Sequence, residues 1–422
     1  MIDVSVAFLQ SDAYGPDEVD RYVSLRSYPG GPVHLFKLSG PTYGQRSAPR
    51  RWYLTLSNWL VSEGYVRGKN DPCLYVHPSG HTIVTWVDDL LCRGSLADSV
   101  DFFNRLGMRF DCKDPEFLEL GGTMTFTGLD ISRECVGGRD WYYLSQLNDM
   151  QEFLHSSGLV DEKQRDASRD APMSNRQTAL SDTGELTESE RSWCRSVIGE
   201  LNHFSRTVKW DIAHAVSRVS QWMRQPVTGT IAALKQVGGF LHKTAGFRIA
   251  GCRRGGADCL TVHVDSDHHG DRNVSTKSHT GVTVLLNGTP IFWRSNKQQL
   301  KTALSPAEAE VYAMSEGCRD ARDIAWTLEE MGCDISWPLK IITDSNGAYS
   351  FQKDNVPKSK LRGCIDRRDD WVAEVQDAGS INAEWISGEE NMANIMTKCL
   401  TPKQYLKERQ VIIDMQSCPD FE

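Results

Sequence analysis

Carboxylates set among apolar residues are the first candidates for chemistry in this sequence. Asp88 and Asp89 interrupt the apolar and β-branched run TIVTWVDDLLC, and Asp3 stands in a similar setting, MIDVSVAFL. Burial of such a carboxylate without a cation or hydrogen bonds costs several kcal/mol. Acids that converge can bind hard cations such as Mg²⁺, and two ions about 4 Å apart support phosphoryl transfer. For Asp88 and Asp89 the plainer alternative of an ordinary turn stays open.

A second set of acids lies in the C-terminal half. Asp265 ends the apolar run LTVHVD, Glu310 lies in the helical stretch SPAEAEVYAMSEG, and Asp344 ends the run KIITD. Taken singly, each of them is typical of a surface acid. Glu308 precedes Glu310 by two residues and would point to another side of a helix. Glu310 is therefore the preferred member of this set.

The elements that position these acids follow from the hydrophobic pattern. Residues 1–155 alternate β-like runs with helical stretches, and in the clearest helix, APRRWYLTLSNWLVSEGY, Trp52, Leu56 and Leu60 recur at helical spacing. Residues 258–402 predict a strand, a hairpin, a long helix, a strand and a final helix, which indicates an α/β sheet domain. Between them we expect a polar linker (156–190) and a helical connection (191–250), and a tail (403–422) follows.

Composition narrows the class of protein. The chain has 422 residues, of which 40% are hydrophobic and 24% charged, and this predicts a soluble protein of two or three domains. No apolar stretch approaches the roughly 20 residues that span a bilayer, and no secretory signal is visible, so we expect an intracellular protein with no membrane partner. The 12 cysteines include no C-x-x-C pair, which argues against a zinc ribbon or a disulfide scaffold.

Charge argues against a protein that simply coats nucleic acid, because the net charge is −9. Basic residues nevertheless gather in three places, and each cluster is equally well read as a solvated face. The clusters are Arg46, Arg50 and Arg51; Arg294, Lys297 and Lys301; and Lys353, Lys358, Lys360, Arg362, Arg367 and Arg368.

The motifs around the first acids resemble a known family. Asp3-Val4 and Ala7-Phe8-Leu9, then KLSGPTYGQRSAPRRWY, NDPCLYV, WVDD and FTGLDIS, resemble the reverse transcriptase of copia-type retrotransposons in order and spacing. The resemblance implies that Asp3 and Asp88 are metal ligands and that Asp89 supports the pair. It also implies nucleotide-binding roles for Arg50, in the Ala48-Pro49-Arg50 motif, and for Phe8, as an aromatic gate against the ribose 2′-hydroxyl. An ordinary core phenylalanine is the alternative for Phe8.

The second set of acids resembles the ribonuclease H domain that follows reverse transcriptase in the same family. Trp293 to Gln298, Ala303-Leu304-Ser305 and Met396-Thr397-Lys398 match the family as well. The resemblance implies hydrolysis of the RNA strand of an RNA·DNA hybrid, with two Mg²⁺ ions per site held by Asp265, Glu310 and Asp344. It implies RNA template, DNA and RNA–DNA hybrid as partners, and a location in a cytoplasmic particle or the nucleus.

The resemblance covers residue 1 to about residue 402 and sets the expected fold class. We expect α+β and α/β architecture: a truncated palm-type polymerase domain without fingers (1–155), the helical connection (191–250) and a ribonuclease H-like domain (258–402). Asp3 is only the third residue, whereas the family's polymerase domain begins well upstream. Ser47 replaces the usual Gln of the nucleotide motif, and Asn394 replaces the Asp of the A-D-I-x-T-K motif, which should weaken a metal site.

These departures predict a truncated and partly decayed copy of the element. His268 and His269, where the family has Trp-Ala, are interpreted as drift on a loop. The competing hypothesis is a catalytically inactive nucleic-acid-binding remnant that keeps the groove but not the reaction. An unrelated magnesium phosphotransferase is disfavoured, because the sequence has no G-x-x-x-x-G-K loop.

Overall fold

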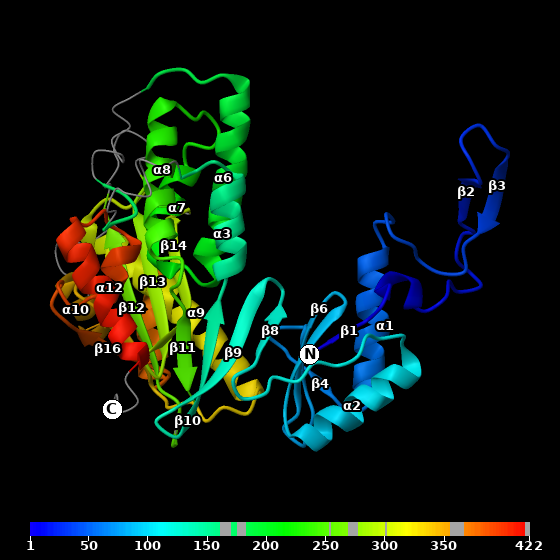
Figure 1. Cartoon of the computed structure of the whole chain (residues 1–422). Helices are drawn as coiled ribbons and strands as arrows, with labels where there is room; N and C mark the ends of the chain where they lie inside the picture. The colour runs from blue at the N-terminus through cyan, green and yellow to red at the C-terminus, as the bar shows by residue number, and fades with distance from the viewer. Residues whose placement is uncertain are drawn as a thin grey trace. The chain divides into compact units, whose positions relative to one another are not determined.

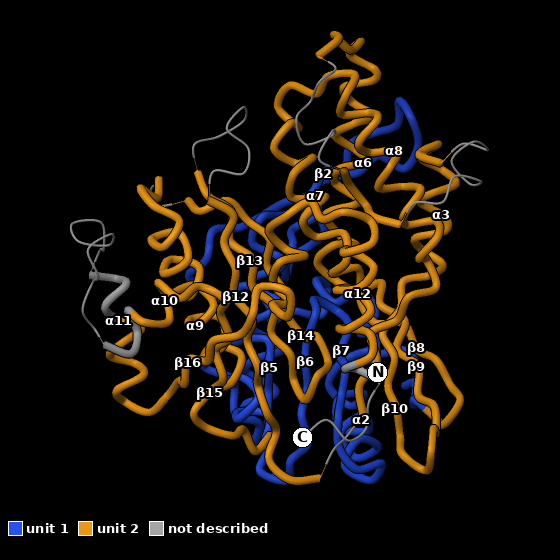
Figure 2. The backbone as a smooth tube through the Cα atoms, turned by 90° about the vertical axis from the view of Figure 1, so that its left-hand side faces the viewer, with its two compact units in different colours: residues 1–118, 327–332 blue, residues 119–326, 333–422 orange. Residues whose placement is uncertain are grey.

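The chain folds into two compact units (Figure 2). The computed structural model describes residues 1–160, 170–174, 183–252, 255–268, 277–299, 302–354 and 367–417. Unit 1 comprises Met1–Leu118 and Thr327–Gly332, and unit 2 comprises Glu119–Trp326 and Cys333–Glu422. The expected linker and tail lie partly outside the described residues, and so do Lys301, Lys358, Lys360, Arg362 and His269.

Unit 1 is built on a five-stranded antiparallel sheet in the order β1-β7-β6-β5-β4. Its strands are β1 (Ile2–Asp3), β4 (Val66–Arg67), β5 (Leu74–Val76), β6 (Thr82–Trp86) and β7 (Asp89–Arg93). The rest of the unit consists of the hairpin of β2 (Tyr22–Arg26) and β3 (Val33–Lys37), the 3-10 helix η1 (Ala7–Gln10) and the helices α1 (Ala48–Ser62) and α2 (Leu96–Arg109).

The core of unit 1 forms where the two helices meet the sheet. Helix α1 begins with a proline in its first turn, where the missing N–H is not needed, and buries Trp52, Leu56 and Leu60 along one face. Phe102 and Leu106 of α2 are fully buried in the same cluster. The helical spacing read from the sequence is therefore confirmed for α1.

The WVDD motif forms the tip of the hairpin between β6 and β7. Trp86 pairs with Asp89, so Val87 and Asp88 make a two-residue turn. Val87 has a φ of 55°, a left-handed conformation that is unfavourable for a β-branched residue. The indole N–H of Trp52 donates a hydrogen bond of 2.5 Å to the carbonyl oxygen of Val87, which ties the tip to α1.

Unit 2 contains two sheets. The first has four antiparallel strands in the order β11-β10-β9-β8, and the second has five strands in the order β14-β13-β12-β15-β16. The strands of the first sheet are β8 (Thr123–Phe126), β9 (Leu129–Val136), β10 (Arg139–Ser145) and β11 (Ile249–Cys252). Those of the second are β12 (Leu260–Asp267), β13 (His279–Leu286), β14 (Thr289–Lys297), β15 (Leu339–Thr343) and β16 (Ile381–Trp385).

The five-stranded sheet combines two kinds of pairing. β12, β13 and β14 pair antiparallel as a meander, whereas β12, β15 and β16 run parallel. Val262 and Val264 of β12 are fully buried, as are Val282 and Val284 of β13, which suits strands covered on both faces. The carboxyl ends of the three parallel strands lie at one edge of the sheet, and the second set of acids lies at this edge.

The helices of unit 2 share a large apolar core, and several of them stand together in Figure 1. Those that precede the second sheet are α3 (Leu147–Ser156), α6 (Glu188–Thr207), the 3-10 helix η2 (Trp210–Ile212), α7 (Ala213–Ser220) and α8 (Thr228–Lys243). Those within or after it are α9 (Pro306–Glu330), α10 (Asn346–Asp354), α11 (Arg367–Asp377), the 3-10 helix η3 (Met392–Met396) and α12 (Pro402–Ser417). The prediction of a mixed α+β and α/β chain is confirmed.

Two features of unit 2 differ from the pattern read in the sequence. Strand β16 at the edge of the sheet was not predicted from the sequence. Its residues INAEW include polar and charged side chains, which give a weak strand signal. Residues 119–155, grouped with the polymerase-like region by sequence, lie in unit 2, where β10 pairs with β11.

Within the described residues, no helix combines the length and the apolar character that crossing a membrane requires.

Candidate metal centre

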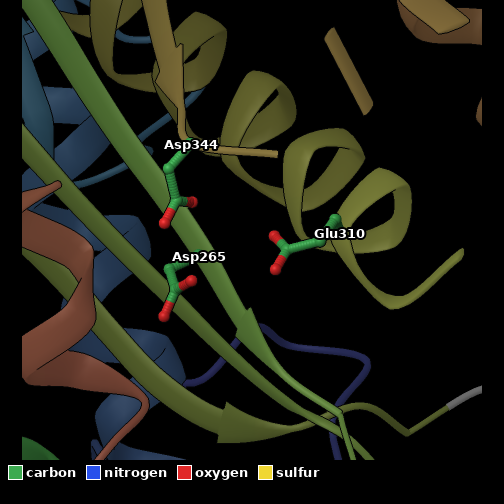
Figure 3. Close-up of side chains that lie close together, drawn as sticks. All are labelled: Asp265, Glu310 and Asp344. Atoms are coloured by element: carbon green, nitrogen blue, oxygen red, sulfur yellow. The ribbon is translucent and has the colours of Figure 1, made fainter. Parts of the chain in front are cut away.

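Three acids from distant parts of unit 2 meet in space: Asp265 of β12, Glu310 of α9, and Asp344 directly after β15 (Figure 3). Each offers one carboxylate oxygen, and these oxygens lie within 4.8 Å of one another. We call these three residues the acidic triad. In the described part of the chain it is the one group of three or more His, Cys, Asp or Glu side chains arranged to hold a metal ion. The triad therefore brings together all three acids that the sequence selected in this half.

Strand register explains why two of the acids meet. His263 of β12 pairs with Ile342 of β15 in the parallel ladder. Two residues further along each strand stand Asp265 and Asp344. Because side chains alternate along a strand, both carboxylates lie on the same face and at the same level of the sheet.

Helix α9 brings the third acid. Its N-terminus is fixed by Ser305, whose hydroxyl accepts a hydrogen bond from the N–H of Glu308, and by the Glu308 carboxylate, which accepts one of 2.7 Å from the N–H of Leu304. Gly317 lets α9 approach β12, because an added Cβ would overlap Val264. Glu308 is thus a capping residue, and Glu310 faces Asp265 and Asp344 (Figure 3).

Glu310 is the member of the triad whose carboxylate is least stabilised by its surroundings. Burial, together with the charges of Asp265 and Asp344, raises the pKa of Glu310 well above its usual value. Its Oε2 atom is shielded from solvent and has no hydrogen-bond partner. A cation placed among the three carboxylates would remove both penalties.

Asp265 is held by donors from the segment that follows η3. The hydroxyl of Thr397 donates to Oδ2, and Nζ of Lys398 lies 3.1 Å from Oδ1 and 3.0 Å from Oδ2. Burial lowers the pKa of Lys398, but the charge and hydrogen bond of Asp265 outweigh it and leave the pKa raised. Gly281, opposite Asp265 in β13, makes room, because an added Cβ would lie 2.6 Å from Thr397 Cγ2.

Asp344 is held by a second group of contacts. Asn391, almost fully buried, donates a hydrogen bond of 3.1 Å to Oδ1 of Asp344 and another of 2.9 Å to the carbonyl oxygen of Val264. The indole N–H of Trp385 donates to the carbonyl oxygen of Asp344 at 3.0 Å. Gly388 passes so close that an added Cβ would lie 3.0 Å from Asp344 Oδ2. Both aspartates are therefore fixed before any cation binds.

Asn394, the residue that replaces the family's Asp, is buried beside this site. Its Nδ2 donates to the carbonyl oxygen of Gly388, and its Oδ1 accepts a hydrogen bond of 2.9 Å from Nζ of Lys398. Nδ2 of Asn394 is thus committed to the backbone, and Oδ1 is shared with Lys398. His268 also departs from the residue expected at its position. Its Nε2 atom lies 3.3 Å from the carbonyl oxygen of Ala303.

The backbones of the three acids expected in unit 1 are neighbours at the hairpin tip, but their carboxylates do not form a group arranged to hold a metal ion. Asp3 of β1 pairs with Asp89 of β7, and the N–H of Val4 donates to the carbonyl oxygen of Asp88 at 2.9 Å. Burial and the charges of Asp88 and Asp3 raise the pKa of Asp89. The carboxylate of Asp3 forms an ion pair of 2.5 Å with Lys113. The backbone geometry is that expected, and the metal-binding role of these acids stays a prediction.

The two nucleotide-binding residues expected in unit 1 differ in exposure, and Phe8 packs against the apolar core of the unit. Phe8 in η1 is half-buried, and its ring centroid lies 4.8 Å from that of Tyr43. Arg50 in the first turn of α1 is exposed, while its neighbour Arg51 pairs with Glu18 and stacks on the ring of Tyr14. Their roles toward a nucleotide also stay predictions.

Several residues of the metal centre were not assigned a role from the sequence. Asn391 gives no signal, because its partners lie 47 and 127 residues away. Thr397 and Lys398 belong to a motif that matches the family, but only the fold shows that both reach Asp265. The capping role of Glu308 has a local signal, since Ser305 precedes it by three residues, as in a capping box.

Known proteins share this sequence over most of its length. The chain is 27% identical over 426 residues to the retrovirus-related Pol polyprotein from transposon TNT 1-94 of Nicotiana tabacum, and the match covers 99% of this chain and 31% of the relative. It is 29% identical over 417 residues to the corresponding polyprotein from transposon RE1 of Arabidopsis thaliana, covering 95% and 26%. A putative transposon Ty5-1 protein of Saccharomyces cerevisiae is 25% identical, covering 75% and 98%.

The chain thus spans about a quarter to a third of the length of the two plant polyproteins. Among solved structures, a foamy viral protease-reverse transcriptase in complex with double-stranded DNA has a TM-score of 0.22 and 12% identity, and the match covers 92% of this chain and 58% of that one. The native prototype foamy virus protease-reverse transcriptase has a TM-score of 0.26 and 12% identity, and the match covers 95% of this chain and 44% of that one. No model of a protein family matches the sequence. Over nearly its whole length, the chain is thus similar in sequence to retrovirus-related Pol polyproteins from plant transposons, and over three quarters of it to a yeast transposon protein.

Proposed function

We propose that the chain is the reverse transcriptase and ribonuclease H region of a retrotransposon Pol polyprotein, and that its nuclease site is the acidic triad. The observation that carries this proposal is the meeting of Asp265, Glu310 and Asp344 within 4.8 Å at one edge of the five-stranded sheet. Their elements are a strand, a long helix and a parallel strand, in the chain order that resembles ribonuclease H.

The residues fit a divalent cation. Three carboxylates supply the hard oxygen ligands that Mg²⁺ prefers, and the shielded Oε2 of Glu310 has no partner of its own. Asp265, Glu310 and Asp344 would hold the ion. When bound, Mg²⁺ would stabilise the negative charge that develops on a phosphate during hydrolysis. Two ions per site are part of the proposal.

The chain's own residues prepare the site. Thr397 and Asn391 hold the carboxylates of Asp265 and Asp344 in place, which limits the reorganisation that cation binding requires. The unpartnered Oε2 of Glu310 leaves one ligand position of the triad open to a cation. We propose the RNA strand of an RNA·DNA hybrid as substrate, on the strength of the relationship to Pol polyproteins.

For unit 1 we propose a palm-type polymerase site at Asp3, Asp88 and Asp89, with Phe8 and Arg50 toward the nucleotide. The supporting observation is the cross-strand pair of Asp3 and Asp89 at the hairpin tip. RNA template and DNA would be its partners, with Mg²⁺ as cofactor. The regions expected from the sequence, 1–155, 191–250 and 258–402, belong to this proposal as functional regions, with residues 119–155 of the first packed in unit 2.

The test is cleavage of a labelled RNA·DNA hybrid by the purified chain in Mg²⁺, with a DNA duplex and single-stranded RNA as controls. We expect Mg²⁺-dependent cutting of the RNA strand, reduced to background in D265N, E310Q and D344N. The matched control is E308Q, which keeps the helix cap and should cut as the wild type does. Salt-sensitive hybrid binding without cleavage would instead support the inactive nucleic-acid-binding remnant.

A further inference from the structure

Lys398 places a positive charge of the chain itself against the triad. Its Nζ lies 3.0 to 3.1 Å from both oxygens of Asp265 and 2.9 Å from Oδ1 of Asn394. With the hydroxyl of Thr397 also on Oδ2, each oxygen of Asp265 already accepts a hydrogen bond. A divalent ion that approaches Asp265 therefore meets an ammonium group in the same place, and the two cations repel.

The side chain of Lys398 is free to leave, whereas Asp265 is not. The Lys398 side chain is 38% exposed, and that of Asp265 is 1% exposed. A lysine carries its charge on a flexible four-carbon stem, which can turn toward water without moving the backbone. Thr397 stays against Asp265, because the close approach at Gly281 fixes the backbone of this segment.

Asn394 determines how strongly the ammonium group of Lys398 is attracted once it has left Asp265. It stands four residues before Lys398 and accepts one hydrogen bond from it, but it carries no charge. Its Nδ2 is held by the carbonyl oxygen of Gly388, which keeps Oδ1 directed at Lys398. An aspartate at this position would attract the ammonium away from Asp265.

We propose that Lys398 is a built-in counter-cation of the triad, and that a divalent ion binds there by displacing its ammonium from Asp265. With Asn394 neutral, Lys398 favours Asp265 and lowers the affinity for the ion. This inference rests on the proposed function for the identity of the site, and it adds the residue that regulates ion binding there.

The experiment measures Mn²⁺ binding by electron paramagnetic resonance, and thermal unfolding in EDTA, on the full chain. K398M should bind Mn²⁺ about tenfold more tightly than the wild type, and it should unfold at a lower temperature in EDTA, because Asp265 loses its counter-charge. K398R keeps the charge and should resemble the wild type. K243M removes a surface lysine that pairs with Asp170 and should leave Mn²⁺ affinity unchanged.

Two further variants place the effect at the triad. N394D alone should increase the affinity for Mn²⁺. Added to K398M, it should increase the affinity by a smaller factor, because part of its effect comes from attracting Lys398 away from Asp265. D265N should cancel the gain of K398M. Mn²⁺ affinity that is unchanged or weaker in both K398M and K398Q would overturn the inference. If the wild type still binds Mn²⁺ and cuts hybrid in that case, the proposed function stands without it. If neither K398M nor the wild type binds Mn²⁺, both are overturned.

Discussion

Glu308 and Glu310 stand two residues apart in α9 and have opposite surroundings. Glu308 is buried and accepts the N–H of Leu304, whereas Glu310 faces Asp265 and Asp344 with one oxygen unpartnered. Replacing Glu308 with Ala should lower the free energy of unfolding by about 1–2 kcal/mol through loss of the cap. Glu308→Gln should stay within about 0.5 kcal/mol of the wild type, because Gln also completes a capping box. Urea denaturation measures both, and equal losses in the two variants would refute the capping role.

Glu310 should destabilise the metal-free protein. Since burial and the charges of Asp265 and Asp344 raise its pKa well above 4.5, Glu310→Gln should increase the free energy of unfolding in EDTA at pH 7.5 by about 1 kcal/mol or more. The folded-state pKa lies above the unfolded one, so the gain should shrink as the pH falls toward 4.5, where the unfolded chain also takes up the proton.

Glu316 of the same helix is the matched control for Glu310. Its carboxylate pairs with Arg294 at 3.5 Å and Arg319 at 3.4 Å, so Glu316→Gln should bring no gain. A metal-free Glu310→Gln protein that is less stable than the wild type would show that the charge of Glu310 is already compensated.

His214 should make unit 2 sensitive to acid. Burial, with a smaller contribution from the charge of Arg218, lowers its pKa to about 3. Between about pH 3 and pH 6.5 the unfolded chain binds a proton that the folded chain does not, so this stabilisation is present above pH 6.5 and is lost as the pH falls. The free energy of unfolding of the wild type relative to His214→Asn should therefore fall by about 1.5 kcal/mol from pH 6.5 to pH 5. A pH-independent difference would contradict the buried neutral histidine.

A buried charge cluster should hold α12 on unit 2. Lys209 and Asp211 are fully buried with Nζ and Oδ2 3.1 Å apart, and Arg409 of α12 reaches the same Oδ2 at 2.8 Å. Lys209→Met leaves Asp211 with one cation fewer and should cost about 3 kcal/mol of unfolding free energy. The exposed pair of Lys243 and Asp170 is the control, and Lys243→Met should cost less than about 1 kcal/mol. Similar losses from both substitutions would count against a special role of the buried cluster.

Val87 should store strain at the hairpin tip of unit 1. It has a φ of 55°, and the residue is 48% exposed, so little packing is lost on truncation. Val87→Gly should raise the free energy of unfolding by about 1 kcal/mol, because glycine adopts left-handed backbone without a Cβ clash. Val87→Ala keeps a Cβ and should gain less. Thermal melts compare them, and a destabilised glycine variant would mean that the turn depends on the valine side chain.

Much of this architecture could be predicted from the sequence because it rests on local patterns. The apolar face of α1, the buried strands β12 and β13, and the three acids of the triad all stand in runs whose period or composition gives a clear signal. The family resemblance selected Glu310, and helix geometry alone separated it from Glu308.

The remaining features depend on contacts between distant residues. Strand β16 has a polar sequence and forms because β15 offers it a parallel edge. Asn391 reaches Asp344 across 47 residues, and Lys398 reaches Asp265 across 133 residues. No local pattern encodes such pairings. The charge balance of the triad, including the counter-charge from Lys398, therefore emerges only from the folded chain.

The most direct test of the central claim is anomalous X-ray diffraction from crystals of the chain soaked in Mn²⁺. We predict an anomalous peak within coordination distance of Asp265, Glu310 and Asp344, and its loss in D265N crystals that retain the fold. Wild-type crystals with Mn²⁺ bound elsewhere, and no peak among these three carboxylates, would contradict the assignment of the triad as a metal centre.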